Sequence, residues 1–172
     1  MRNEKHKKLV DLIVFTMLGV IMFISKLLLE GLPNVHLLGT LITAYTIVYR
    51  KDALKPIYIF VLIFGIYYGF GTWWIPYLYI WAILWGMIML LPKNMKPQIA
   101  VPVYMAVSGL HGLLYGTLYA PVQAIIFGLD FKGMLAWIAA GFYFDITHAI
   151  GNVVLGVLIL PIATALKKFH KY

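Results

Sequence analysis

The stretch from Gly141 to Pro161 reads GFYFDITHAIGNVVLGVLILP and joins an apolar helical pattern to three polar side chains. Asp145, His148 and Asn152 stand at positions i, i+3 and i+7, so on an α-helix they share one face over two turns. An ionisable side chain at membrane depth costs about 2.5–3.5 kcal/mol, so it normally faces protein or a watery cavity. The stretch therefore predicts a membrane helix whose polar face looks inward.

The composition supports a membrane protein. Of 172 residues, 63% are hydrophobic and 12% are charged, and the mean hydropathy is +0.90. Soluble domains carry about 25% charged residues. The chain has no cysteine, which excludes disulfides, thiolate catalysis and cysteine-bound metals.

The net charge of +8 raises the question of nucleic-acid binding, but the distribution of the basic residues argues against such a partner. Twelve of the fourteen Lys and Arg fall into four clusters, separated by apolar stretches in pairs: Arg2–Lys8, Arg50–Lys55, Lys93–Lys96 and Lys167–Lys171. If each stretch crosses the bilayer, all four clusters lie on one side. This positive-inside pattern predicts that both termini are cytoplasmic.

The sequence thus predicts an all-α membrane protein, a single compact bundle of six transmembrane helices. We expect these helices at about 9–29, 34–50, 54–70, 75–91, 100–127 and 134–166. Asn34 is expected to cap the second helix. The fifth segment is too long for one untilted span, so we expect either a kink at Pro121 or a short outer segment. The basic start is interpreted as part of a retained first helix, because no small-residue cleavage site follows it.

Polar and aromatic residues are expected to converge near the outer leaflet. The short second helix has a polar side with His36, Thr40, Thr43 and Thr46, which predicts contact with protein or water rather than lipid. The aromatic turn before the fourth helix is either an interfacial belt or a platform that stacks on an organic ligand. We expect one aromatic-lined cavity. Its candidate binding residues are Trp73, Trp74, Tyr77, Trp81, His111, Tyr115, Tyr119, Asp145, His148 and Asn152.

Two other interpretations of the polar face remain open. Asp145, His148 and Asn152 could form a purely structural hydrogen-bond network with His111. The DxxH spacing could also hold a metal or act as an acid–base pair, with His111 as third group. No HExxH, GxSxG, Walker lysine loop or GxGxxG after a strand occurs, so the favoured prediction is a non-enzyme without metal or cofactor that cannot itself use ATP through a phosphate loop.

Four segments resemble the substrate-binding membrane subunits (S components) of energy-coupling factor (ECF) transporters, the vitamin importers of prokaryotes. They are LPNVHLLGT at 32–40, WWIPYLYIW at 73–81, HGLLYGTLYAP at 111–121 and FDITHAIGN at 144–152. The resemblance also covers the length, the six helices and the basic cytoplasmic turns.

The resemblance implies a subunit of the prokaryotic plasma membrane that binds a vitamin-like ligand outside. It further implies a coupling transmembrane subunit and two cytoplasmic ATPases as partners. The family's AxxxA docking pattern is missing from the first helix, so Gly19, Gly65 and Gly69 are the candidate docking residues.

Because no buried Arg or Lys is expected, the ligand should be a neutral or cationic heteroaromatic compound. The alternatives are a small intramembrane metal-dependent enzyme, and a stand-alone carrier, channel or assembly factor.

Overall fold

The computed structural model describes residues 2–169, and within that range the chain forms helices and no strands. The elements are α1 (Arg2–Leu28), α2 (Leu38–Tyr49), α3 (Leu54–Tyr68), α4 (Tyr77–Met89), α5 (Pro97–Leu113), α6 (Tyr115–Phe127), α7 (Phe131–Leu155) and α8 (Ile159–Phe169), with three short 3₁₀ turns, η1 (Arg50–Ala53), η2 (Thr72–Trp74) and η3 (Gly156–Leu158). The predicted all-α class is confirmed.

Four segments of the described chain are long and apolar enough to cross a membrane. They are Glu4–Leu28, Thr72–Met89, Pro97–Phe127 and Phe131–Lys168. By contrast, α2 has 12 residues and α3 has 15, fewer than the roughly 20 that a bilayer core requires.

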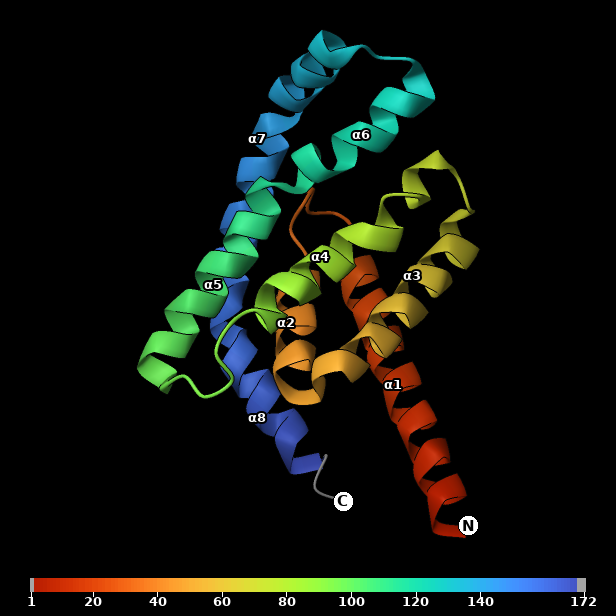
Figure 1. Ribbon diagram of the computed structural model, residues 1–172, viewed down its shortest axis with the longest axis vertical. Coiled ribbons are helices and arrows are strands. Elements are labelled where there is room, and N and C mark those ends of the chain that lie inside the picture. The colour runs from red at the N-terminus through yellow and green to blue at the C-terminus, as the bar shows by residue number, and fades with distance from the viewer. Residues whose placement is uncertain (1, 170–172) are drawn as a thin grey trace.

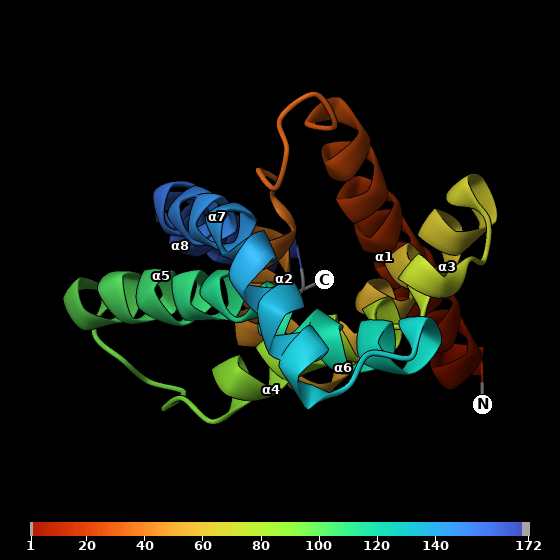
Figure 2. The ribbon, with the colours of Figure 1, turned by 90° about the horizontal axis from the view of Figure 1, so that it is seen from above.

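Helix α2 is the centre of the bundle. It packs against α4 and α8, while α1 lies along α3 and α5 lies along α7. Figure 2 shows α1 and α3 on one side of the molecule and α5, α7 and α8 on the other. Ten of the twelve residues of α2 are buried. The side chains of His36, Thr40, Thr43 and Thr46 are also buried, which confirms that the polar side of this segment faces protein.

The connection before α2 differs from the prediction. Helix α2 begins at Leu38 without a side-chain cap, so the expected start at Asn34, and the capping role of Asn34, are wrong. Asn34 instead adopts a left-handed turn conformation with φ 58°, which asparagine tolerates better than most residues. The loop enters the bundle before the helix starts, and this course buries His36.

The expected fifth helix is two helices. The chain breaks at Leu114, not at Pro121, and α6 turns away from the line of α5 (Figure 1). The backbone N–H of Gly116, in the first turn of α6, donates to Asp145 Oδ1 at 2.9 Å. A carboxylate from α7 thus satisfies one of the amides that a new helix start leaves without a partner. Pro121 lies inside α6.

The expected last helix also has different boundaries. Helix α7 begins at Phe131, where the Asp130 side chain caps it by accepting from the Gly133 N–H at 2.7 Å. The 3₁₀ turn η3 interrupts the helix at Gly156, where an added Cβ would lie 2.7 Å from Met105 Cγ of α5. Helix α8 then continues to Phe169; Lys171 of the fourth basic cluster lies outside the described residues.

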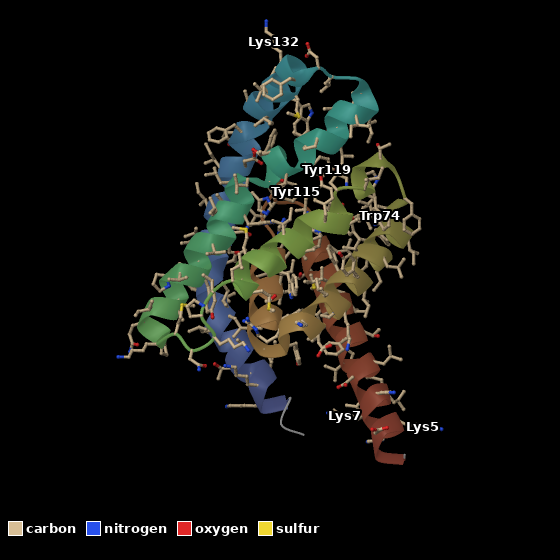
Figure 3. The ribbon with its side chains drawn as sticks, in the orientation of Figure 1. Lys5, Lys7, Trp74, Tyr115, Tyr119 and Lys132 are labelled. Carbon is tan, nitrogen blue, oxygen red and sulfur yellow. The ribbon has the colours of Figure 1, made fainter. Side chains whose placement is uncertain are left out.

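The first and last helices place basic residues at one end of the molecule. The start of α1 and the end of α8 lie at the same end (Figure 1). Figure 3 shows Lys5 and Lys7 at that end and Lys132 at the opposite tip.

Candidate ligand-binding site

Three buried histidines from separate segments meet inside the bundle. His36 comes from the α1–α2 loop, His111 from α5 and His148 from α7, and each is at most 4% exposed. The ring centroids of His36 and His148 are 4.6 Å apart, and those of Tyr115 and His148 are 4.8 Å apart. Trp81 of α4 lies against both His36 and His111, at 5.8 and 5.9 Å.

Two of the predicted polar residues are tied to helix backbones. His111 Nε2 lies 3.0 Å from the Ile80 carbonyl of α4, and this nitrogen must donate because a carbonyl oxygen only accepts. Asn152 Nδ2 donates to the Ser108 carbonyl of α5 at 2.9 Å. These bonds join α4 to α5 and α5 to α7, so both side chains hold the wall of the site in place.

Other polar atoms in the same region have no hydrogen-bond partner. They are Nδ1 and Nε2 of His148, Nδ1 of His36 and of His111, Oδ2 of Asp145, Nε1 of Trp81, and the hydroxyl oxygens of Thr40, Thr43 and Ser108. An unsatisfied buried donor or acceptor costs about 1–3 kcal/mol, and buried polar groups are nearly always paired. A concentration of such atoms around His148 therefore indicates a place that water or a polar ligand completes.

Two cavities border this cluster and share Asn34 in their walls. The first, of about 330 Å³, lies between α1, α3 and the aromatic turn. Its walls are Lys26, Glu30, Leu32, Pro33, Asn34, Phe64, Tyr68, Trp73 and Tyr77. The second, of about 440 Å³, lies between α6 and α7 and is called the α6–α7 cavity below. Its walls are Asn34, Tyr115, Gly116, Tyr119, Trp137, Ala140, Gly141, Phe144 and Asp145.

The structure brings most of the predicted site residues together, but around two cavities rather than one. Tyr115, Tyr119 and Asp145 line the α6–α7 cavity, whereas Trp73 and Tyr77 line the first. The Tyr119 hydroxyl donates to the Trp73 carbonyl, which links the two walls. The other buried residues of the set, Trp81, His111, His148 and Asn152, lie in the bundle interior.

Trp74 does not join this group. Its Nε1 donates to the Val61 carbonyl of α3 at 2.9 Å, and its ring packs edge-on against Phe70. Figure 3 shows it beside α3, well separated from Tyr115. Its contacts are those of a packing residue.

Sequence reasoning did not include three residues that the fold adds to the site. His36 was noted only for the polar side of the second helix, yet its ring lies against His148. Asn34 was considered only as a helix cap, and Trp137 was not singled out. No periodic pattern marks Asn34, because it lies in a loop, whereas Trp137 precedes His148 by eleven residues, or about three turns, and so shares its face of α7.

Two of the three glycines predicted to contact a partner subunit also lie in close contacts within the chain. A Cβ on Gly19 would lie 2.6 Å from Ile59 Cγ2 of α3, and a Cβ on Gly65 would lie 2.4 Å from the Phe70 ring. Both glycines therefore serve contacts within the chain. Gly69 is exposed and ends α3 with φ 85°, a conformation that favours glycine.

The described residues contain no group of three or more His, Asp or Glu side chains placed to hold a metal ion. Comparison with protein-family models, with curated proteins and with solved structures finds no match for this chain. The four candidate spans, the apolar exterior and the polar centre are typical of a multi-pass helical membrane protein.

Proposed function

We propose that this chain is the substrate-binding membrane subunit of an importer of the energy-coupling factor type. It would capture a vitamin or related small heteroaromatic micronutrient from outside the prokaryotic plasma membrane. A coupling transmembrane subunit and two cytoplasmic ATPases would complete the importer. The observation that carries this proposal is His148, a 2% exposed imidazole with both ring nitrogens unpartnered, lying against Tyr115 beside an aromatic-lined cavity.

The wall chemistry supports capture of an organic ring. Small-molecule sites are concave and mostly apolar, with a few placed polar groups. Here tyrosine, tryptophan and phenylalanine supply flat surfaces, while Asn34 and Asp145 supply hydrogen-bonding atoms, and the unpartnered nitrogens of His148 lie behind Tyr115. Asn34 comes from the α1–α2 loop and Asp145 from α7, so the two polar side chains line the cavity from different segments.

The proposed topology has six crossings and cytoplasmic termini. In addition to the four long segments, α2 and α3 would cross, with the short α2 shielded from lipid by its neighbours. Lys5 and Lys7 would lie on the cytoplasmic side and Lys132 outside, in keeping with the positive-inside rule (Figure 3). The α6–α7 cavity lies toward the Lys132 end, because α6 and the first half of α7 form that end (Figure 1).

Exposed apolar residues leave α1 available for a membrane partner. Leu9, Ile13, Met17 and Ile21 recur every four residues, so they share one face of α1, and they are 46–59% exposed. In the proposed assembly this face contacts lipid or the coupling subunit. The glycines used inside the chain would not be needed for that contact.

Native mass spectrometry of protein purified from cells grown in rich medium tests the capture role. We expect a retained compound of vitamin-like mass in the wild type and its loss in His148→Ala. Uptake into liposomes should then require the coupling subunit and ATPases. Uptake by the chain alone would instead identify a self-sufficient carrier, and the absence of any bound compound or uptake would refute the proposal.

A further inference from the structure

Three aromatic rings with similar orientation line the α6–α7 cavity. The ring centroids of Tyr115 and Tyr119 are 5.9 Å apart with planes inclined by 29°. Those of Tyr119 and Trp137 are 6.2 Å apart with planes inclined by 14°. Phe144 adds a fourth aromatic side chain from α7. The face of each such ring carries partial negative charge, so an array of this kind attracts a cation.

One carboxylate belongs to the same wall. Asp145 is 4% exposed, and its Oδ1 accepts from the Gly116 N–H while its Oδ2 has no partner. The only ion pair formed within the described part of the chain is Lys55–Asp52, so no lysine or arginine neutralises Asp145. Figure 3 shows Lys132, the basic residue of α7, at the tip of the molecule and away from Tyr115.

An ionised carboxylate that is buried without a counter-charge is strongly unfavourable. The single backbone amide of Gly116 satisfies one oxygen only. A cationic ligand in the cavity would supply the missing charge, and the ring faces would surround its apolar parts. An anionic ligand would meet both the carboxylate and the negative ring faces, so it would be excluded.

We infer that the α6–α7 cavity binds a small organic monocation, with Asp145 as its counter-ion and Tyr115, Tyr119 and Trp137 as its aromatic wall. This inference rests on the proposed function and narrows its ligand from heteroaromatic compounds in general to singly charged cationic ones. Asn34 lies in the same wall, where its amide can bond a polar substituent of the ligand. The cavity volume of about 440 Å³ suits a ring compound of one or two rings.

The test uses three probes that share one ring. 1-Methylnicotinamide is a permanent monocation, nicotinamide is neutral, and nicotinate is an anion. Binding is measured by calorimetry on the full chain in dodecyl maltoside, whose sugar headgroup carries no charge and so neither attracts nor repels a charged probe. We expect the cation to bind about tenfold more tightly than nicotinamide, as a desolvated cation–π contact allows, and nicotinate not to bind.

Variants then identify the residues that cause the preference for the cation over the neutral probe. Asp145→Asn keeps an oxygen for the Gly116 N–H but removes the charge, so the affinity for 1-methylnicotinamide should fall about tenfold while that for nicotinamide stays the same. Trp137→Leu should weaken the cation more than nicotinamide, because both lose a stacking surface but only the cation also loses a cation–π contact, and it tests the wall even if Asp145→Asn fails to fold. Tyr143→Leu is the matched control, because Tyr143 is 73% exposed on the same helix and lines neither cavity.

Equal affinity for the cation and for nicotinamide in the wild type would overturn the inference. So would unchanged cation affinity in both Asp145→Asn and Trp137→Leu. These failures differ from failure of the proposed function. A neutral micronutrient retained in native mass spectrometry would refute the preference for a monocation while supporting the capture role. Cation-selective binding without energy-dependent uptake would support the preference for a monocation and refute the importer role.

Discussion

The contact of α5 with α7 at Gly112 gives a sharp test of the packing. A Cβ on Gly112 would lie 2.9 Å from both the Cα and the N of Ala149, and 3.0 Å from Asn152 Nδ2. The two close atoms of Ala149 are backbone, so no side-chain rotation can relieve the contact. In Gly112→Ala the helices must separate, which would also lengthen the Asn152–Ser108 hydrogen bond of 2.9 Å.

The expected cost follows from typical overpacking. Forcing an extra methyl group into a packed interior costs about 1–3 kcal/mol. For a chain of this length, 1 kcal/mol shifts the unfolding midpoint by about 2–4 °C, so Gly112→Ala should lower it by about 2–12 °C. Tryptophan fluorescence during thermal unfolding in detergent measures the shift.

Gly86→Ala is the matched control for this experiment. Gly86 lies inside α4, and an added Cβ there would meet no atom within 4 Å. Alanine is favoured over glycine in a helix by about 0.5–1 kcal/mol, so this variant should unfold at the wild-type temperature or above it. A Gly112→Ala midpoint equal to that of Gly86→Ala would refute the close approach of α5 and α7.

Three further predictions concern the cover of the site, its central imidazole and the topology. Tyr79→Phe removes the 2.6 Å hydrogen bond from the Tyr79 hydroxyl to the Leu118 carbonyl of α6. Because such a bond contributes about 0.5–1.5 kcal/mol, amide hydrogen exchange in α6 should become about 2- to 10-fold faster. Unchanged exchange would show that this bond does not hold α6. His148→Phe removes two unpartnered buried nitrogens, so the unfolding temperature should stay the same or rise while affinity for the retained ligand falls. A large loss of stability with intact affinity would instead show that His148 is a structural residue. Because the chain has no cysteine, Lys5→Cys and Lys132→Cys can each be labelled in intact cells with a membrane-impermeant maleimide; only Lys132→Cys should react, and labelling of Lys5→Cys would reverse the orientation.

The residues around Asp145 show what sequence reasoning could and could not find. The i, i+3, i+7 spacing on one helix face identified Asp145, His148 and Asn152 as inward-facing, and all three are buried. Periodicity could not separate their roles, because these depend on atoms from other helices. Asn152 donates to the Ser108 carbonyl and Asp145 Oδ1 accepts from the Gly116 amide, whereas Asp145 Oδ2 and both nitrogens of His148 have no partner.

By itself the sequence determined that the chain is helical and membrane-embedded, because apolar composition, segment length and the placement of charge are local properties. Only the tertiary structure decided where α5 ends, that His36 enters the bundle and that Trp137 joins Tyr119 at one cavity. After the break at Leu114, the Gly116 amide at the start of α6 donates to the carboxylate of Asp145, 29 positions beyond Gly116 in the chain. Contacts over such separations arise when helices pack, and no spacing within a single helix encodes them.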